Sequence, residues 1–204
     1  MTFLSDLLPG RVLAALACGL IALAPAARAA DPATETLPAA WQTHEYRFTF
    51  TGFTSDYSCN GLAGDLKTLL LAAGARADVK VVPVGCGPAA TSKLASAYLT
   101  FATLAPAAGS TTAAASGDTQ AIWRKVEFAS HSPTGSGPRN LSIGSCELVQ
   151  QFRRDLLPMF TTRSVDDKST CVPHQLSGSG MNLRFESLAL LPTKKDAGAT
   201  SAGK

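Results

Sequence analysis

The clearest pattern in the chain is the alternation of apolar and polar residues in two short stretches. Over residues 46–51 every second residue is aromatic, and over residues 181–186 Met, Leu and Phe alternate with Asn, Arg and Glu. This period of two is typical of a strand that buries one face and leaves the other open. The second pattern slips in phase at Ser187, which predicts a β-bulge at that position.

Two other segments have apolar residues three or four positions apart, as in helices that bury one face. The first follows Ser58 or Asn60, either of which can cap it, and Gly74 is placed to end it. The second follows Ser145 and ends near Pro158. The apolar positions of the two helices are Leu62, Leu66, Leu69, Leu70 and Ala73, and then Leu148, Val149, Phe152 and Leu156.

Further strands are predicted at residues 79–84, 98–104, 122–128 and 161–165. The first of these is apolar on both faces, so we expect it inside the sheet as far as Pro83. The resulting order is strand, helix, strand, strand, twice, and it resembles that of ferredoxin-like domains with extra strands. Two helices cannot cover both faces of six strands. The predicted fold is therefore α+β, a mainly antiparallel sheet with two helices packed on one face.

Four cysteines of the expected mature chain form two similar pairs, Cys59 with Cys86 and Cys146 with Cys171. The first of each pair opens a predicted helix, and the second stands two residues before a proline. Four cysteines allow three connectivities, and we expect Cys59–Cys86 and Cys146–Cys171 because both are local and recur at the same place. The two halves also match at five positions counted from the first cysteine, Leu62/Val149, Lys67/Arg154, Leu69/Leu156, Leu70/Leu157 and Arg76/Arg163. Each half is thus predicted to carry one disulfide, and the halves to be an internal duplication.

The N-terminus is predicted to be a secretory signal peptide. Arg11 precedes an apolar run, and Ala27-Arg28-Ala29 fits the small-x-small cleavage rule. An alternative is a lipoprotein acylated at Cys18. The predicted organisation is a signal peptide at 1–29, a single α+β domain at 30–192 with half-repeats at about 41–104 and 121–191 joined by a linker at 105–120, and a disordered tail at 193–204.

Charge excludes some classes of partner. The chain has 18 basic and 15 acidic residues, a net charge of +3. That excess is too small to predict binding to nucleic acid or to an anionic membrane. Once the signal is removed, the sequence predicts no transmembrane segment. Its histidines His44, His131 and His174 lack metal-binding spacing, and the glycine-rich stretches lack the features of a phosphate loop. We therefore expect no metal or cofactor.

The open face of the sheet is the predicted binding surface, with Arg47, Trp123 and Arg184 as its candidate residues. Such residues on a flat sheet suit an envelope protein or a glycan. One alternative is a small envelope hydrolase that uses His174 as general base. Another is thiol–disulfide chemistry at Cys59 or Cys146, whose thiol pKa would be lowered at a helix N-terminus.

The segments Ser55–Cys59, Leu69-Leu70, Gly74–Arg76 and Val79–Cys86 resemble those of small exported proteins of proteobacteria that have no assigned activity. The resemblance implies a periplasmic or secreted location and carries no substrate or catalytic residue. The function expected from the sequence is therefore a non-enzymatic binding or accessory module of the cell envelope.

Overall fold

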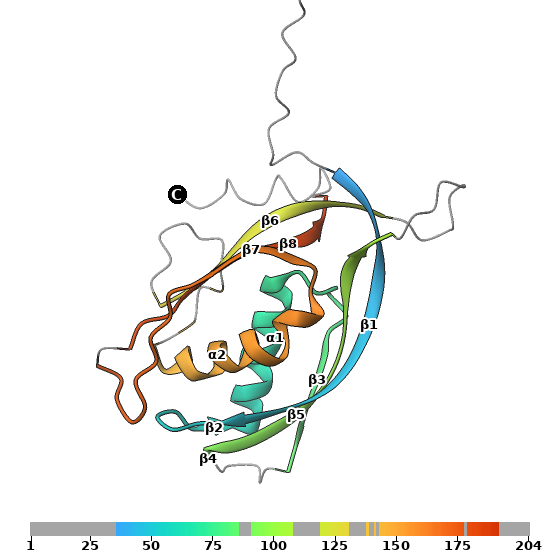
Figure 1. The fold of residues 1–204 in the computed structure, drawn as a ribbon. Coiled ribbons are helices and arrows are strands. Elements are labelled where there is room, and N and C mark those ends of the chain that lie inside the picture. Colours follow the sequence, from blue (N-terminus) through green and yellow to red (C-terminus); the bar gives the residue numbers. More distant parts are fainter. Residues whose placement is uncertain are drawn as a thin grey trace, which may run out of the picture.

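A six-stranded antiparallel sheet curves around two helices in the computed structural model of the chain (Figure 1). The structure describes residues 36–85, 91–107, 119–130, 138, 141, 143–177 and 179–191. The predicted signal peptide and tail, most of the linker, Cys86 and His131 lie outside these ranges. The mainly antiparallel sheet and the two helices of the predicted fold are confirmed.

The strand order of the large sheet is β3-β5-β1-β6-β8-β7, and β2 pairs with β4 in a separate two-stranded ribbon. The bounds are β1 Thr36–Thr51, β2 Tyr57–Ser58, β3 Lys80–Val84, β4 Thr91–Ser92, β5 Leu94–Pro106, β6 Thr119–Ala129, β7 Thr162–Asp167 and β8 Asn182–Leu190. The helices are α1 Cys59–Ala73 and α2 Cys146–Asp155, with short 3-10 turns η2 Ile143–Ser145 and η3 Leu157–Met159. Each described half runs strand, helix, strand, strand apart from the small ribbon, as the sequence predicts.

Both helices pack on the same face of the sheet, and one apolar core joins them. In β1, Phe48 and Phe50 are fully buried in this core, while Arg47, Thr49 and Thr51 are exposed. The helix residues that fill the core include all nine predicted apolar positions. The alternation in β1 therefore separates a helix-covered face from a helix-free face.

The termini of α1 are formed as the sequence predicts. The Ser58 hydroxyl accepts a hydrogen bond from the Gly61 N–H at 3.1 Å. Gly74 has φ 108° and ends the helix, with its N–H directed to Leu70 and Leu71. Ser145 occupies the corresponding position before α2, but its side chain makes no capping hydrogen bond there.

Two predictions about strands are wrong. β3 lies at the edge of the sheet, not inside it. Val79 is buried, but Val82 is 56% exposed on the other face, and an edge position is where a strand tolerates Pro83. The bulge predicted at Ser187 is also absent, because β8 keeps continuous register with β6. The alternation of apolar and polar residues breaks at Ser187 because β8 is buried on both faces from that residue on. The Ser187 hydroxyl donates a hydrogen bond to the Ala73 carbonyl of α1.

The strands extend a few residues beyond the bounds predicted from the sequence. β1 begins at Thr36, before the predicted start at 41, and β5 continues to Pro106. β6 begins at Thr119, so both ends of the predicted linker 105–120 belong to strands. Within the described ranges, neither helix has the length and apolar character that a membrane crossing requires.

Candidate functional site

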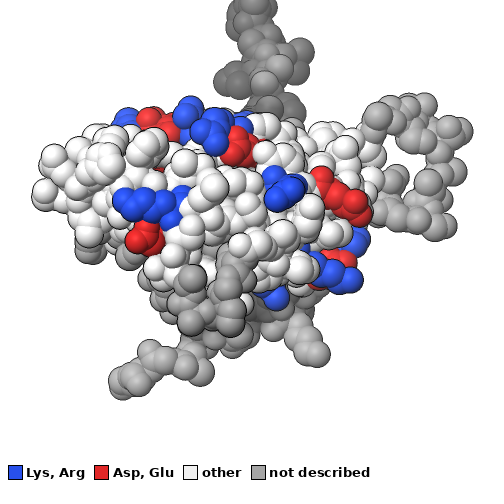
Figure 2. Space-filling model, turned by 90° about the horizontal axis from the view of Figure 1, so that it is seen from below, with Lys and Arg blue, Asp and Glu red and all other residues white. Residues whose placement is uncertain are grey.

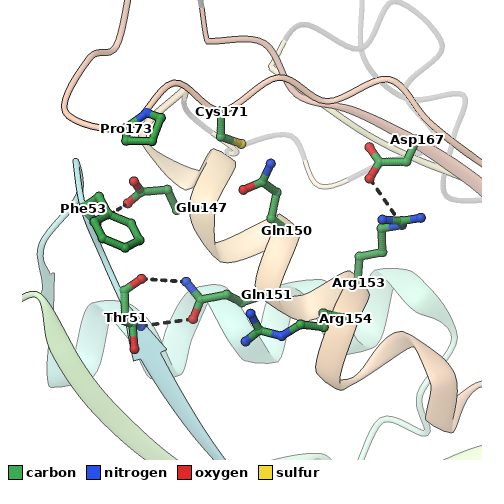
Figure 3. Close-up of a pocket in the computed structure, with 10 residues that line it drawn as sticks. All are labelled: Thr51, Phe53, Glu147, Gln150, Gln151, Arg153, Arg154, Asp167, Cys171 and Pro173. Atoms are coloured by element: carbon green, nitrogen blue, oxygen red, sulfur yellow. Dashed lines mark hydrogen bonds and ion pairs between the residues drawn. The ribbon is translucent and has the colours of Figure 1, made fainter.

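A groove follows the outer side of α2 (Figure 3). Its larger part has a volume of about 660 Å³, and a second hollow of about 370 Å³ adjoins it toward η3. Arg153 and Arg154 line both parts. The size is within the usual range of ligand sites, roughly 300–1,000 Å³.

The floor of the groove carries polar side chains from one helix face. Gln150, Arg153 and Arg154 are exposed positions of α2 and line the groove (Figure 3). Arg153 forms an ion pair of 3.2 Å with Asp167 of β7. Arg154 forms one of 2.6 Å with its neighbour Asp155. Both cations on the floor are thus paired, and the charged side chains that line the groove are two of each sign, Arg153 and Arg154 with Glu147 and Asp167.

The first wall of the groove is the end of β1 and the turn after it, which α2 holds by two side chains. The Glu147 carboxylate is 8% exposed and accepts hydrogen bonds from the backbone N–H groups of Phe53, Thr54 and Ser55. One helical turn later, Gln151 bonds both backbone groups of Thr51. The turn is thereby fixed to the first two turns of α2.

The second wall is the loop after β7, and it is fixed to the same helix. Cys171 is joined by a disulfide to Cys146, the first residue of α2. A pair of 2.7 Å backbone hydrogen bonds between Thr170 and Gly180 closes this loop at its base. The Thr54 hydroxyl donates to the Val172 carbonyl at 3.4 Å, so the two walls also meet.

His174, the candidate general base, lies in this second wall. Its backbone has φ 62°, a left-handed conformation that is unusual for a residue other than glycine. Its ring packs edge-to-face on Phe53 of the first wall, with centroids 6.0 Å apart. His174 therefore lies beside the groove, in contact with the 54% exposed Phe53, but it is not among the residues that line the groove.

The predicted binding residues lie elsewhere, on the helix-free face of the sheet. Arg47 stands between the partly buried Tyr46 and the buried Phe48 of β1 and lies 5.6 Å from the ring centroid of Tyr98. Trp123 is covered by Arg163 at 4.4 Å. Arg184 pairs with Glu127 at 2.8 Å. All three share one face, but each is engaged within the chain, and a role in binding stays a prediction.

Of the remaining candidate residues, His44 is held by contacts within the fold. His44 faces the helix side, where its ring nitrogen is 2.8 Å from the Thr103 hydroxyl, and burial lowers its pKa. Within the described part of the chain, no cluster of three or more His, Cys, Asp and Glu residues is placed to hold a metal ion.

The predicted Cys146–Cys171 disulfide is confirmed. Cys59 is disulfide-bonded as well. The pairing Cys59–Cys86 stays a prediction because Cys86 lies outside the described residues. Cys59 and Cys146 are the first residues of α1 and α2, as predicted, and in the structure both are held as disulfides.

The sequence interpretation missed the groove because its lining comes from three separated segments. Phe53, Gln150 and Pro173 have no common motif. One signal was present in α2, where Glu147 and Gln151 stand four residues apart among apolar neighbours. Polar side chains at helical spacing on a buried face indicate that another segment of the chain must provide their hydrogen-bond partners.

Comparisons of the chain with models of protein families, with curated proteins and with solved structures found no match.

Proposed function

We propose that the protein is an exported module of the cell envelope that acts by binding, and that the groove along α2 is its ligand site. One observation carries this proposal: both walls of the groove are anchored on the same helix. Glu147 and Gln151 hold one wall, and the Cys146–Cys171 disulfide holds the other. A site fixed in this way loses little conformational entropy when a ligand binds.

Site-specific photo-crosslinking in cells tests the proposal. A photoreactive amino acid in place of Gln150 places the probe on the groove floor, and one in place of Arg47 places it on the helix-free face. We expect crosslinked envelope material from position 150 and not from position 47. Crosslinking only from position 47 would instead place the binding site on the helix-free face, as predicted from the sequence. Crosslinking from neither position would contradict a binding function.

Export and the second disulfide are tested by intact mass. We expect protein purified from the periplasm to begin near Ala30 and to carry both Cys59–Cys86 and Cys146–Cys171. An acylated Cys18 would instead indicate a lipoprotein. Free thiols at Cys59 or Cys146 would favour thiol chemistry over structural disulfides.

An internal duplication is part of the proposal, and two observations support it. The strand orders β3-β5-β1 and β7-β8-β6 repeat one arrangement from opposite edges of the sheet. In each half an arginine lies over the tryptophan of its first strand, Arg76 over Trp41 and Arg163 over Trp123. The two arginines are equally far along the chain from the cysteine that opens their helix.

A hydrolase that uses His174 is the second candidate. The observation that favours it is the left-handed backbone at His174 beside the groove, since strained residues are concentrated at functional sites. His174→Ala should then abolish hydrolysis of a model ester without changing the fold. An unchanged rate, or the absence of hydrolysis by the wild-type chain, would remove this candidate.

A further inference from the structure

We infer that the ligand of the groove is an uncharged oligosaccharide. This inference rests on the proposed binding function and names the chemistry of its ligand. A sugar ring has an apolar face of C–H groups and a rim of hydroxyls, each of which can donate and accept a hydrogen bond. A site for it therefore combines flat apolar surfaces with planar polar side chains, and the groove has both.

The apolar surfaces are at the end of the groove where the two walls meet. Phe53 is 54% exposed, and its ring lines the hollow together with Pro173 (Figure 3). Their backbones are held by Glu147 on one side and by the disulfide of Cys171 on the other. An exposed aromatic ring that is fixed in this way offers a sugar a surface on which to stack.

The polar side chains are on the floor. Gln150 presents an amide, Arg153 and Arg154 present guanidinium groups, and Asp167 presents a carboxylate (Figure 3). Together they provide several donors and several acceptors in planar groups. The Arg153–Asp167 pair crosses from the floor to the β7 side, so adjacent hydroxyls of one sugar could bond both partners.

The charge of the groove argues against a polyanion. Arg153 and Arg154 are each paired with an aspartate. Charges of both signs are also interspersed over the face of the molecule seen in Figure 2, with uncharged residues between them. A polyanionic glycan would have to compete with these carboxylates, whereas a neutral chain can bond to both partners of each pair.

The strands beside the groove argue against an extended peptide. A peptide that adds to a sheet needs a regular free edge. β7 is the edge strand here, but Ser164 has φ 54° and the register shifts between Arg163 and Asp166. On the other side, the Gln151 side chain already occupies the backbone groups of Thr51. Neither β7 nor the end of β1 therefore offers a continuous row of free backbone groups with which a peptide could pair.

Binding of neutral oligosaccharides by the mature chain tests the inference. The probes are hexasaccharides of β-linked glucose and of β-linked N-acetylglucosamine, with a polyuronate hexamer and an extended hexapeptide for comparison, each titrated by calorimetry. We expect a neutral oligosaccharide to bind and the polyuronate and the peptide not to bind. Phe53→Ala should weaken binding at least tenfold, and Gln150→Ala several-fold.

Tyr98→Ala is the matched control. Tyr98 is 50% exposed, close to the value for Phe53, but it lies on the helix-free face. We expect its replacement to leave affinity unchanged. Equal losses from Tyr98→Ala and Phe53→Ala, or a loss from Tyr98→Ala alone, would overturn the assignment to the groove.

The outcome also separates this inference from the proposed function. If position 150 captures a protein in cells and no neutral oligosaccharide binds, the groove is a protein-binding site and the inferred ligand class is wrong. Preferred binding of the polyuronate or of the hexapeptide would overturn the ligand class in the same way. If position 150 captures nothing and no probe binds, the proposed function fails together with its ligand.

Discussion

Gln151 completes the backbone hydrogen bonding of Thr51, the last residue of β1. The Thr51 N–H donates to the Gln151 side-chain oxygen at 3.0 Å, and the Gln151 side-chain nitrogen donates to the Thr51 carbonyl at 2.8 Å. A helix side chain thus takes the place that a neighbouring strand would occupy. These two hydrogen bonds attach α2 to the sheet at the point where the groove begins.

Gln151→Ala should destabilise the protein, because it removes both hydrogen bonds that the buried Gln151 side chain makes to the backbone of Thr51. We expect a loss of about 1–3 kcal/mol in the free energy of unfolding, measured by urea denaturation. Gln150→Ala is the neighbouring control, and it should change stability by less than about 0.5 kcal/mol because Gln150 is exposed. Equal effects of the two substitutions would contradict the role given to Gln151.

Two glycines, Gly64 inside α1 and Gly74 at its C-terminal cap, should respond in opposite directions to replacement by alanine. Gly74 has φ 108°, and a Cβ there would lie 2.9 Å from the Leu188 carbonyl oxygen, so Gly74→Ala should cost about 1–3 kcal/mol. Gly64 is an exposed position inside the helix with open space around it. Gly64→Ala should stabilise the protein by about 0.5–1 kcal/mol. Thermal unfolding of the pair checks both signs.

The two arginine–tryptophan contacts should differ in strength. Arg163 lies 4.4 Å from the Trp123 ring centroid, whereas Arg76 lies 5.6 Å from that of Trp41. Double-mutant cycles with Arg→Gln and Trp→Leu should give a coupling energy of roughly 1 kcal/mol for the first pair and less for the second. A coupling near zero in both cycles would show that these contacts do not stabilise the fold.

Tyr57 should make stability depend on pH in the alkaline range. Burial is the main cause that raises its pKa to about 12, and the nearby Asp65 adds to it. Because the folded pKa exceeds the unfolded value of about 10, the stabilisation is complete below pH 10 and is lost as the pH rises toward 12. The loss should be on the order of 2–3 kcal/mol relative to Tyr57→Phe, which lacks the ionisable hydroxyl.

This dependence can be measured as the difference in unfolding free energy between the two proteins from pH 9 upward. Phenolate absorbance provides a second reading, since one tyrosine of the folded wild-type chain should titrate late. If both proteins lose stability in parallel, the shift assigned to Tyr57 is wrong.

The helix ends and the buried face of β1 were predicted well from the sequence, because these features depend on residues that are neighbours in the chain. Ser58 and Gly74 have the side chain and the flexibility that a helix end requires, whatever the rest of the fold. The alternation of Phe48 and Phe50 with polar residues likewise specified which face of β1 is buried. These features required no knowledge of strand order.

Strand order and the groove could not be predicted in this way. The valines of β3 resemble those of an interior strand, and only the pairing of β5 with β1 leaves β3 at the edge. The groove depends on Phe53 and Pro173 meeting across α2, which is a consequence of the tertiary structure. Cys171 did indicate that its loop returns to the start of α2, and the structure confirms that contact.

Within the described residues, the pairing between β1 and β6 is short, and this bears on how the molecule would yield under load. In the part of the chain that the structure describes, four residue pairs join these strands, from Thr36↔Ile122 to Ala39↔Thr119, whereas thirteen join β1 to β5. A force that separates the two halves would therefore meet little backbone resistance at this seam. The halves are held together chiefly by the apolar core between the helices and the sheet, so their cohesion should weaken in denaturants and on cooling, as hydrophobic contacts do.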